Sequence, residues 1–183
     1  MKIAHRKNIL FRDRAWWDTL VNLASGGGGF AHSELVFDNG ESFTSTTEFA
    51  PATLVYPSAT DLLHLGRKNG PLLRRINFPD WEYEFTVVPA SPAQKLQVYQ
   101  WCVETIDQSI KDHAGYDWAG VLRFVFKFLK QHPRDWFCSE AVVAALQTQG
   151  WFAHIRPWAV SPNRLRELCR IMLNSNPQPP API

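Results

Sequence analysis

The sequence predicts an α+β domain in which an antiparallel sheet packs against helices. Short apolar or alternating segments lie between turn residues in the first half of the chain, which is typical of β-strands. Longer segments in the second half repeat apolar residues at helical spacing. Strands that come first and helices that come later favour an α+β layout. The chain has 183 residues, of which 45% are hydrophobic, so we expect one domain over residues 1–173 rather than two.

The first half of the chain carries the predicted strands. Residues 8–11 form a short apolar segment that predicts a strand, and residues 15–24 have helical spacing. The four consecutive glycines at 26–29 end that helix, because glycine is unfavourable in the interior of a helix or strand. Residues 49–70 contain two prolines and short apolar pieces and are ambiguous. The strands expected after the glycines are 30–37, 41–46, 72–76 and 82–88.

A hairpin is expected between the strands at 30–37 and 41–46. The connecting residues are Asp38, Asn39 and Gly40. An Asn-Gly pair accepts the positive φ angles of a type I′ turn, so the sequence predicts that turn type here.

The second half of the chain carries the predicted helices. Ser91 suits the N-cap and Pro92 suits the first position of a long amphipathic helix that ends at 113–115. The other helices are expected at 117–129, at 139–148 before Gly150, and from Ser161-Pro162 to residue 173. Residues 174–183 are rich in proline and are expected to form a loose tail.

Composition and charge argue against several classes of protein. The formal net charge is +2 and the Lys and Arg residues form no long run, which argues against nucleic-acid binding. The cysteines are far apart and form no CxxC pair, so neither a structural zinc site nor a disulfide framework is expected. The sequence contains no stretch of ~20 apolar residues that would suit a membrane span, and its start does not resemble a signal peptide. We therefore expect a cytoplasmic protein without a cofactor or metal.

Two titratable residues stand on one face of the strand predicted at 30–37. Side chains alternate between the faces of a strand, so His32 and Glu34 share one face and the apolar Leu35 lies on the other. The two polar residues either lie on the solvent face of an edge strand or line a cleft. An imidazole beside a carboxylate is the arrangement that orients a catalytic base and stabilises its charged form.

Cys138 lies where an apolar segment becomes the helix predicted at 139–148. The N-terminus of a helix presents unpaired N–H groups and a partial positive charge, which favour a thiolate and can bind an oxyanion. The other two cysteines lack this setting, because Cys102 lies in mid-helix and Cys169 lies on the apolar side of the last helix. Both are interpreted as small buried hydrophobic residues. Cys138 is therefore the candidate nucleophile.

Three short motifs follow one another along the chain. They are His-x-Glu at 32–34 before the Asn-Gly hairpin, Tyr-Asp-Trp at 116–118, and Trp-Phe-Cys-Ser-Glu at 136–140. This order resembles the permuted papain-like amidases, the YiiX/YaeF-type relatives of the NlpC/P60 cell-wall hydrolases of bacteria and phages. In ordinary NlpC/P60 enzymes the cysteine helix precedes the histidine strand, whereas in the permuted branch the histidine comes first, as here. The resemblance covers residues 8–163 and implies a permuted papain-like fold.

The resemblance implies a role for each candidate residue. Cys138 would be the nucleophile, His32 the general base, and Glu34 the group that orients the histidine. Alternatives for the orienting group are Ser45, Asp117 and Glu140, and candidates to bind substrate are Tyr116, Asp117 and Trp136. A zinc site of His32, Cys138 and His154 is a weaker alternative, because no two of these residues have the close spacing typical of zinc ligands. The glycines before His32 have no counterpart in the family.

The resulting prediction is a cysteine hydrolase that works through an acyl-enzyme. The expected substrate is an amide, either in a peptide or, by the resemblance, in a peptidoglycan stem peptide. A cell-wall role without an export signal would need a lysis system or a place in a phage particle. Two alternatives remain open. One is a lipid ester hydrolase or acyltransferase with the same Cys-His site, similar to the lecithin–retinol acyltransferase group, and the other is a catalytically silent phage or host-interaction module.

Overall fold

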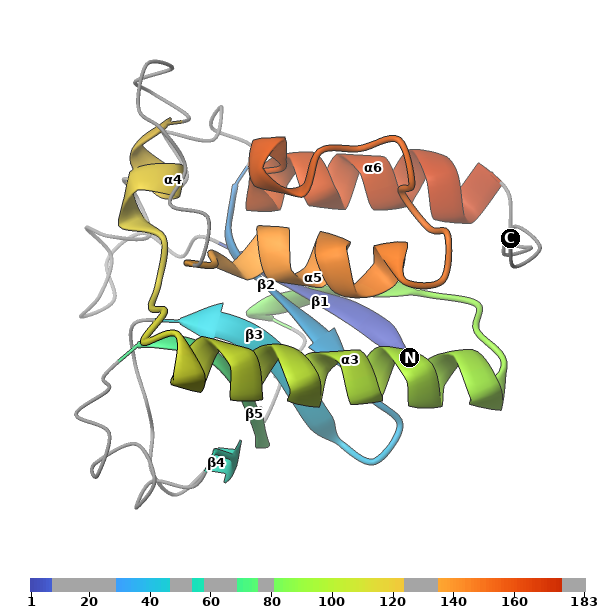
Figure 1. Cartoon of the computed structure of the whole chain (residues 1–183). Coiled ribbons are helices and arrows are strands. Elements are labelled where there is room, and N and C mark those ends of the chain that lie inside the picture. The colour runs from blue at the N-terminus through green and yellow to red at the C-terminus, as the bar shows by residue number, and fades with distance from the viewer. Residues whose placement is uncertain (8–28, 47–53, 58–68, 76–80, 124–134, 176–183) are drawn as a thin grey trace.

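The computed structural model describes residues 1–7, 29–46, 54–57, 69–75, 81–123 and 135–175 (Figure 1). The strands in these ranges form one antiparallel sheet and are β1 (Lys2–Lys7), β2 (Phe30–Val36), β3 (Glu41–Thr46), β4 (Leu54–Tyr56), β5 (Gly70–Arg75) and β6 (Tyr83–Val87). The helices are α3 (Pro92–Lys111), α4 (Trp118–Arg123), α5 (Cys138–Gln147) and α6 (Pro162–Ser175), with a short 3-10 helix η2 (Pro157–Ala159). The predicted α+β class, with an antiparallel sheet packed against helices, is confirmed.

Three helices form a layer over one face of the sheet. The strands follow one another across the sheet in the order β4-β5-β3-β2-β1-β6. Helices α3, α5 and α6 lie side by side (Figure 1). α3 contacts β5, α5 contacts β2 and β3, and α6 contacts β2 and β6. The helix over the centre of the sheet is therefore α5, and it lies where β2 and β3 are neighbours.

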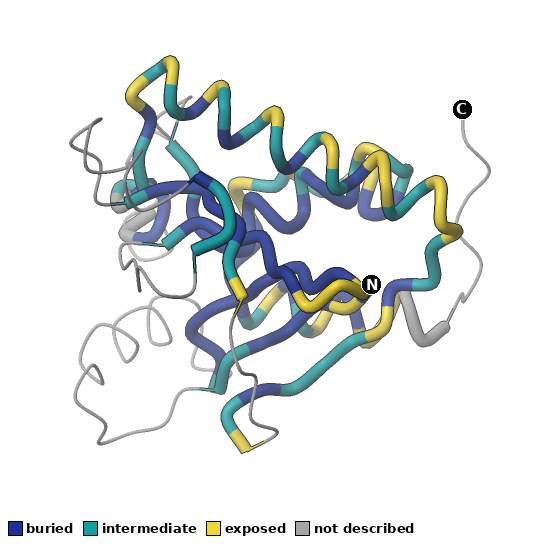
Figure 2. Tube along the Cα trace, turned by 90° about the horizontal axis from the view of Figure 1, so that it is seen from below, coloured by how far each residue is buried: buried dark blue, intermediate teal, exposed yellow. Residues whose placement is uncertain are grey.

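The main hydrophobic core lies between the helices and the sheet. It contains Ile3, Leu35 and Phe43 from the three central strands and the inward faces of α3, α5 and α6. Figure 2 shows α3 alternately buried and exposed along its length, as an amphipathic helix at the surface should be. Every residue of β2 is buried, so the polar side chains of this strand meet their partners inside the protein.

Most of the predicted elements in the described part of the chain are confirmed, with ends that differ by one or two residues. Ser91 is the N-cap of α3: its Oγ accepts from the Gln94 N–H at 3.2 Å, and the Gln94 side chain accepts from the Ser91 N–H at 2.9 Å. α6 continues to Ser175, two residues into the segment predicted as a tail. The strand predicted at 8–11, the helix predicted at 15–24, residues 124–129 of the fourth predicted segment and tail residues 176–183 lie outside the described residues.

The hairpin between β2 and β3 does not have the predicted type I′ turn. That turn needs positive φ at both central residues, but Gly40 alone has a positive φ here, at 81°. The Gly40 N–H donates to the Phe37 carbonyl at 3.1 Å, and the Phe37 N–H donates to the Glu41 carbonyl at 2.8 Å. The connection is therefore a three-residue loop that ends in a left-handed glycine. Asn39 keeps an ordinary φ, and its side chain accepts from the Glu41 N–H at 3.0 Å.

β1 has no counterpart among the predicted strands, although it pairs with β2 on one side and β6 on the other. Its sequence, Lys-Ile-Ala-His-Arg-Lys, is too polar to show the alternation expected of a strand. Its central residues Ile3, Ala4 and His5 are nevertheless buried by their neighbours. Pairing with distant strands, rather than local pattern, forms this strand.

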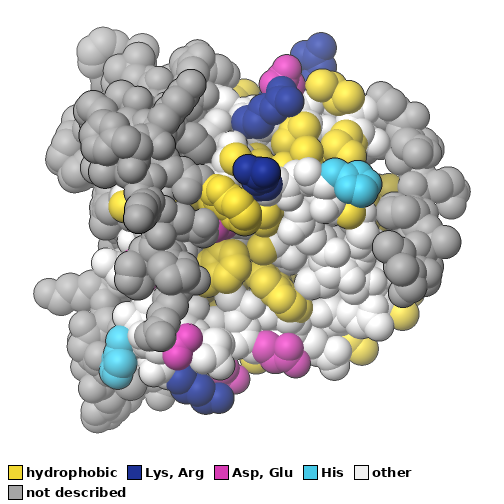
Figure 3. Space-filling model, turned by 45° about the horizontal axis from the view of Figure 1, so that its top comes forward, with side chains coloured by type: hydrophobic (Ala, Val, Ile, Leu, Met, Phe, Trp, Pro, Cys, Tyr) yellow, Lys and Arg dark blue, Asp and Glu magenta, His cyan; other side chains and the backbone are white. Residues whose placement is uncertain are grey.

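The surface over the helices carries apolar side chains. Figure 3 turns the top of Figure 1 toward the viewer and shows apolar side chains gathered near the middle of this face. The large apolar side chains that η2 and α6 leave exposed are Trp158, Ile171 and Met172. None of the described helices has both the length and the apolar composition needed to cross a bilayer.

Candidate active site

β2 and β3 separate at the point where α5 begins. Their backbones pair at two positions next to the hairpin, and continuing that register would place Ser33 of β2 opposite Ser45 of β3. Instead, the Thr44 hydroxyl donates to the Ser33 carbonyl at 3.0 Å. The Ser45 hydroxyl donates to the Trp136 carbonyl, two residues before α5, at 2.6 Å. The chain that leads into α5 therefore lies against the edges of both strands where they part.

Cys138 is the first residue of α5 and is 1% exposed. Its sulfur accepts hydrogen bonds from two backbone N–H groups, those of Ser33 on β2 and Ser139 in the first helical turn. Ser33 still pairs with His5 of β1, but the separation of the strands removes the partner that its N–H would otherwise have on β3. α5 begins without a side-chain oxygen that caps its N–H groups, so the positive end of the helix acts on the sulfur. This setting favours a thiolate.

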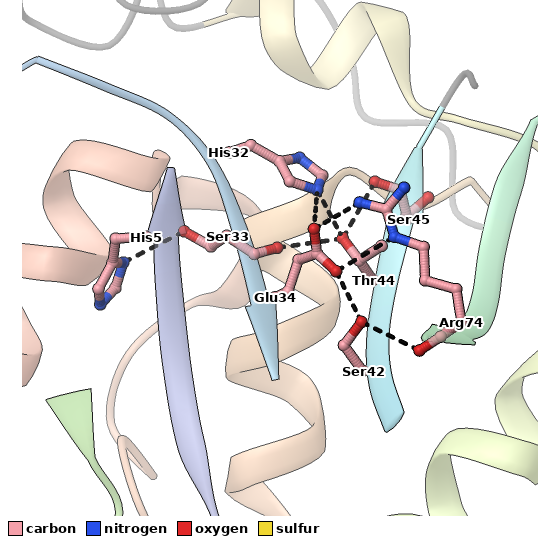
Figure 4. Close-up of polar contacts among 8 residues, drawn as sticks. All are labelled: His5, His32, Ser33, Glu34, Ser42, Thr44, Ser45 and Arg74. Carbon is pink, nitrogen blue, oxygen red and sulfur yellow. Dashed lines mark hydrogen bonds and ion pairs between the residues drawn. The ribbon is translucent and has the colours of Figure 1, made fainter. Parts of the chain in front are cut away.

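His32 lies at the same end of β2, and its two ring nitrogens have different partners. Nε2 is 3.2 Å from Thr44 Oγ1 and 3.3 Å from Glu34 Oε1 (Figure 4). The Thr44 hydroxyl gives its proton to a backbone carbonyl, and an ionised carboxylate only accepts, so Nε2 carries a proton. Nδ1, which points away from Glu34 in Figure 4, is then the nitrogen that serves the hydrogen bond between His32 and Cys138.

Glu34 is fully buried, and donors from three strands surround its carboxylate. Arg74 on β5 makes a bidentate ion pair, in which Nη2 donates to Oε1 and Nε donates to Oε2 at 3.2 Å. Ser42 on β3 donates to Oε2 at 2.8 Å, and His32 approaches Oε1. Figure 4 shows these side chains converging on the carboxylate. All of these partners are donors, as an ionised carboxylate requires.

The charges of the site depend on one another. Burial raises the pKa of Glu34, but the Arg74 guanidinium and then His32 outweigh burial and hold that pKa well below its usual range. Burial alone would lower the pKa of His32, but the Cys138 thiolate and then Glu34 outweigh burial and raise it to about 9. Burial alone would raise the pKa of Cys138, but the His32 imidazolium and two backbone N–H groups lower it. A thiolate–imidazolium pair beside an ionised carboxylate is therefore favoured at neutral pH.

The other buried thiols and the other buried histidine of the described chain have different electrostatics. Cys102 and Cys169 lie in the main core, and burial raises the pKa of both thiols. His5 on β1 is also buried, and burial followed by the charge of Arg166 lowers its pKa to about 3. His5 is therefore neutral at physiological pH, whereas His32 is charged. Cys138 is the described cysteine whose surroundings favour a nucleophile.

The structure brings together the three residues predicted to be catalytic. The edge-strand alternative for His32 and Glu34 is wrong, because β2 lies inside the sheet and both side chains are buried. Glu34 reaches the histidine, whereas the alternatives for the orienting group bond elsewhere. Ser45 donates to a backbone carbonyl before α5, Asp117 caps the start of α4, and Glu140 accepts from the N–H of Phe137, the residue before α5.

The three residues predicted to bind substrate lie together beside the start of α5. Tyr116 and Trp136 form a parallel β-bridge, in which the Asp117 N–H donates to the Trp136 carbonyl at 3.1 Å. The Trp136 ring packs edge-on against Trp101, with ring centroids 6.0 Å apart. Tyr116 and Trp136 are half-buried, but Asp117 is 1% exposed. Tyr116 and Trp136 therefore keep part of their surface exposed beside the start of α5, whereas Asp117 is buried and bonds the Gly120 N–H.

His154, the third residue of the zinc alternative, is exposed in the turn that follows α5. Across the described ranges, His, Cys, Asp and Glu side chains form no group of three or more that would hold a metal ion.

Three further residues of the site, Ser42, Thr44 and Arg74, are not among those predicted from the sequence. Ser42 and Thr44 are two residues apart on β3, as His32 and Glu34 are on β2, so each pair shares one face of its strand. Two polar residues at this spacing just after the hairpin could have indicated that β3 contributes to the site. Arg74 had no such signal. It reaches Glu34 because β5 pairs with β3 in a register that puts Arg74 opposite Ser42, and this pairing is distant in sequence.

Comparisons of the chain with family models, curated proteins and solved structures found no match. The function must therefore be argued from the geometry and chemistry of the site.

Proposed function

We propose that this protein is a cysteine hydrolase that cleaves an amide through an acyl-enzyme. The observation that carries the proposal is the position of His32 between two partners. Its Nε2 proton is held by Glu34 and Thr44, while its other nitrogen serves the Cys138 thiol. A nucleophile, a base and an orienting carboxylate in this order is the recurring geometry of covalent acyl transfer.

The thiolate–imidazolium pair supports a two-step reaction. The Cys138 sulfur attacks the carbonyl carbon, and the carbonyl electrons move to oxygen. When the tetrahedral intermediate collapses, the C–N bond breaks and His32 gives its Nδ1 proton to the leaving amine. Neutral His32 then takes a proton from water, the resulting hydroxide attacks the thioester, and the thiolate leaves as the acid is released. Glu34 holds the imidazole in one orientation through both steps.

The start of α5 provides one donor for the oxyanion. The first N–H groups of a helix have no partner within the helix, and the N–H of Cys138 is the first of α5. It lies on the residue that carries the attacking sulfur, so it is close to the carbonyl oxygen in the tetrahedral intermediate. The partial positive charge of the helix N-terminus stabilises the same oxygen.

We further propose a permuted papain-like fold. The strand with the histidine, β2, precedes the helix with the cysteine, α5, along the chain, and α5 packs across β2 and β3. This order of the two elements is that of the permuted papain-like amidases. By that resemblance the proposed substrate is a peptide or a peptidoglycan stem peptide, acted on in the cytoplasm or by a phage particle.

Trapping the acyl-enzyme tests the proposed function. The protein would be mixed with peptide amides, stem-peptide fragments and fatty acyl esters, quenched in acid, and analysed by intact and peptide-level mass spectrometry. We expect an acyl adduct on Cys138 together with product release. Neither should occur in C138A, because the thiolate forms the covalent bond. The matched control is C169S, which changes a cysteine of the core and should keep both adduct and turnover.

The same panel separates the candidate functions. Adducts from amides support the proposal. Adducts from fatty esters alone would replace it with the lipid ester hydrolase or acyltransferase. A folded protein that forms no adduct with any acyl donor would contradict catalysis. It would instead support the alternative of a catalytically silent interaction module.

A further inference from the structure

Glu34 has a charged partner that the proposed Cys-His-Glu mechanism does not use. This partner is Arg74, whose side chain is 11% exposed. Arg74 lies on β5, which β3 separates from β2 in the sheet. Its Nη2 and Nε bond the two carboxylate oxygens separately. A bidentate pair of this kind fixes the plane of the carboxylate as well as its distance.

The bidentate pair aims one oxygen of Glu34 at the histidine. Oε2 is occupied by Arg74 Nε and the Ser42 hydroxyl, and Oε1 is shared by Arg74 Nη2 and His32 Nε2. A rotation of the carboxylate would break both Arg74 bonds at once. Arg74, which reaches the carboxylate from β5, therefore sets the orientation of Glu34 toward His32 (Figure 4).

Arg74 also balances the charge of the buried site. Arg74, Glu34, His32 and Cys138 form a row of alternating positive and negative groups with no net charge when the thiol is ionised. Removing the guanidinium leaves one excess negative charge in a buried setting. Such a site takes up a proton, either on the carboxylate or on the thiolate. Both outcomes weaken the ion pair that the reaction needs.

We propose that Arg74 is a positioning residue of this site, which keeps Glu34 ionised with Oε1 aimed at His32 and so maintains the Cys138 thiolate. This inference rests on the proposed function. The next residue of β5 offers a matched control. Arg75 pairs with Glu41 at 3.1 Å, but its side chain is 67% exposed, and an exposed ion pair contributes little.

The test is the pH midpoint for formation of the Cys138 thiolate in R74Q, R74K and R75Q. The midpoint comes from iodoacetamide alkylation rates, with the label located by mass spectrometry and folding checked by circular dichroism. In R74Q we expect the midpoint to rise by about one pH unit and the rate below the midpoint to fall about tenfold. R74K should lie between R74Q and the wild type, because an ammonium keeps the charge but cannot make both bonds. R75Q should match the wild type.

The E34Q background shows whether Arg74 acts through Glu34. If it does, adding R74Q to E34Q should shift the midpoint little further, because the carboxylate that Arg74 positions is already gone. An equal shift in both backgrounds would overturn the inference, and so would a wild-type midpoint in folded R74Q and R74K. If R74Q does not fold, the midpoint of R74K tests the inference, and a wild-type midpoint in folded R74K would overturn it. A wild-type protein whose midpoint equals that of a free thiol would instead contradict the proposed function.

Discussion

The Thr44 hydroxyl lies 3.2 Å from Nε2 of His32 and gives its own proton to the Ser33 carbonyl, 3.0 Å away. A hydroxyl with its proton committed can only accept from the ring. Together with Glu34, it therefore fixes the Nε2 proton and leaves Nδ1 to face the thiol. The carbonyl that Thr44 bonds is that of Ser33, which would pair with β3 if the two strands continued in register. The protonation of His32 therefore depends on the separation of β2 and β3, because that separation leaves the Ser33 carbonyl to the Thr44 hydroxyl.

Replacing Thr44 with Val tests this assignment. T44V keeps the shape of the side chain but removes the acceptor for Nε2 and the donor for the Ser33 carbonyl. We expect alkylation of Cys138 at neutral pH to slow by about two- to fivefold and the free energy of unfolding to fall by about 1–2 kcal/mol. The measurements are alkylation kinetics and urea unfolding. The control is T86V, whose hydroxyl lies 3.5 Å from Nε2 of the neutral His5 and whose loss should not slow alkylation. Unchanged kinetics in T44V would remove Thr44 from the site.

The buried carboxylate of Glu34 predicts a dependence of stability on acid. Its pKa in the folded protein lies below that in the unfolded chain, so its contribution is present above the unfolded value of about 4.3 and is lost as pH falls below it. E34Q should be less stable than the wild type at neutral pH, because Arg74 loses its charged partner. The difference should shrink below about pH 4, by up to about 1.4 kcal/mol per pH unit. Urea unfolding across this range checks it, and a constant difference would contradict an ionised Glu34.

The raised pKa of His32 predicts the alkaline limit of turnover. His32 must carry a proton to release the leaving amine, and the thiolate and Glu34, acting against burial, raise its pKa to about 9. Turnover of an amide should therefore fall as pH rises through this value. Alkylation of Cys138 should not fall there, because it needs only the thiolate. A parallel decline of both rates would indicate loss of the fold instead.

Asp117 should matter for stability and not for chemistry. Its Oδ1 accepts from the Gly120 N–H at 2.7 Å and so caps the first turn of α4. We expect D117A to lower the free energy of unfolding by about 1 kcal/mol, and D117N to recover most of it, because Asn is also a good cap. Neither should move the pH midpoint of Cys138. A folded D117N without turnover would instead place this carboxylate in the reaction.

The part of the site that follows local rules could be predicted from the sequence. The period of two along a strand put His32 and Glu34 on one face, and the start of an amphipathic helix marked Cys138 out from the two cysteines within helices. These signals need only neighbouring residues. The predicted helix cap at Ser91 is confirmed for the same reason.

The remaining features depend on contacts between distant segments. Arg74 enters the site through the register of β5 on β3, and β1 is a strand because β2 and β6 pair with it. The turn at Gly40 is set by where the strand pairing ends, which Asn-Gly alone does not specify. Local patterns carry no information on such pairings.

The central claim is that His32 makes Cys138 a thiolate, and the pH dependence of alkylation by iodoacetamide tests it most directly. Rates would be measured in the wild type and in H32A, with mass spectrometry reporting Cys138 beside Cys102 and Cys169 in the same molecules. We expect rapid labelling of Cys138 well below the free-thiol pKa of about 8.5, slow labelling of the other two, and a large upward shift of the Cys138 midpoint in H32A. A wild-type midpoint at or above that of a free thiol, or one that H32A leaves unchanged, would contradict the account.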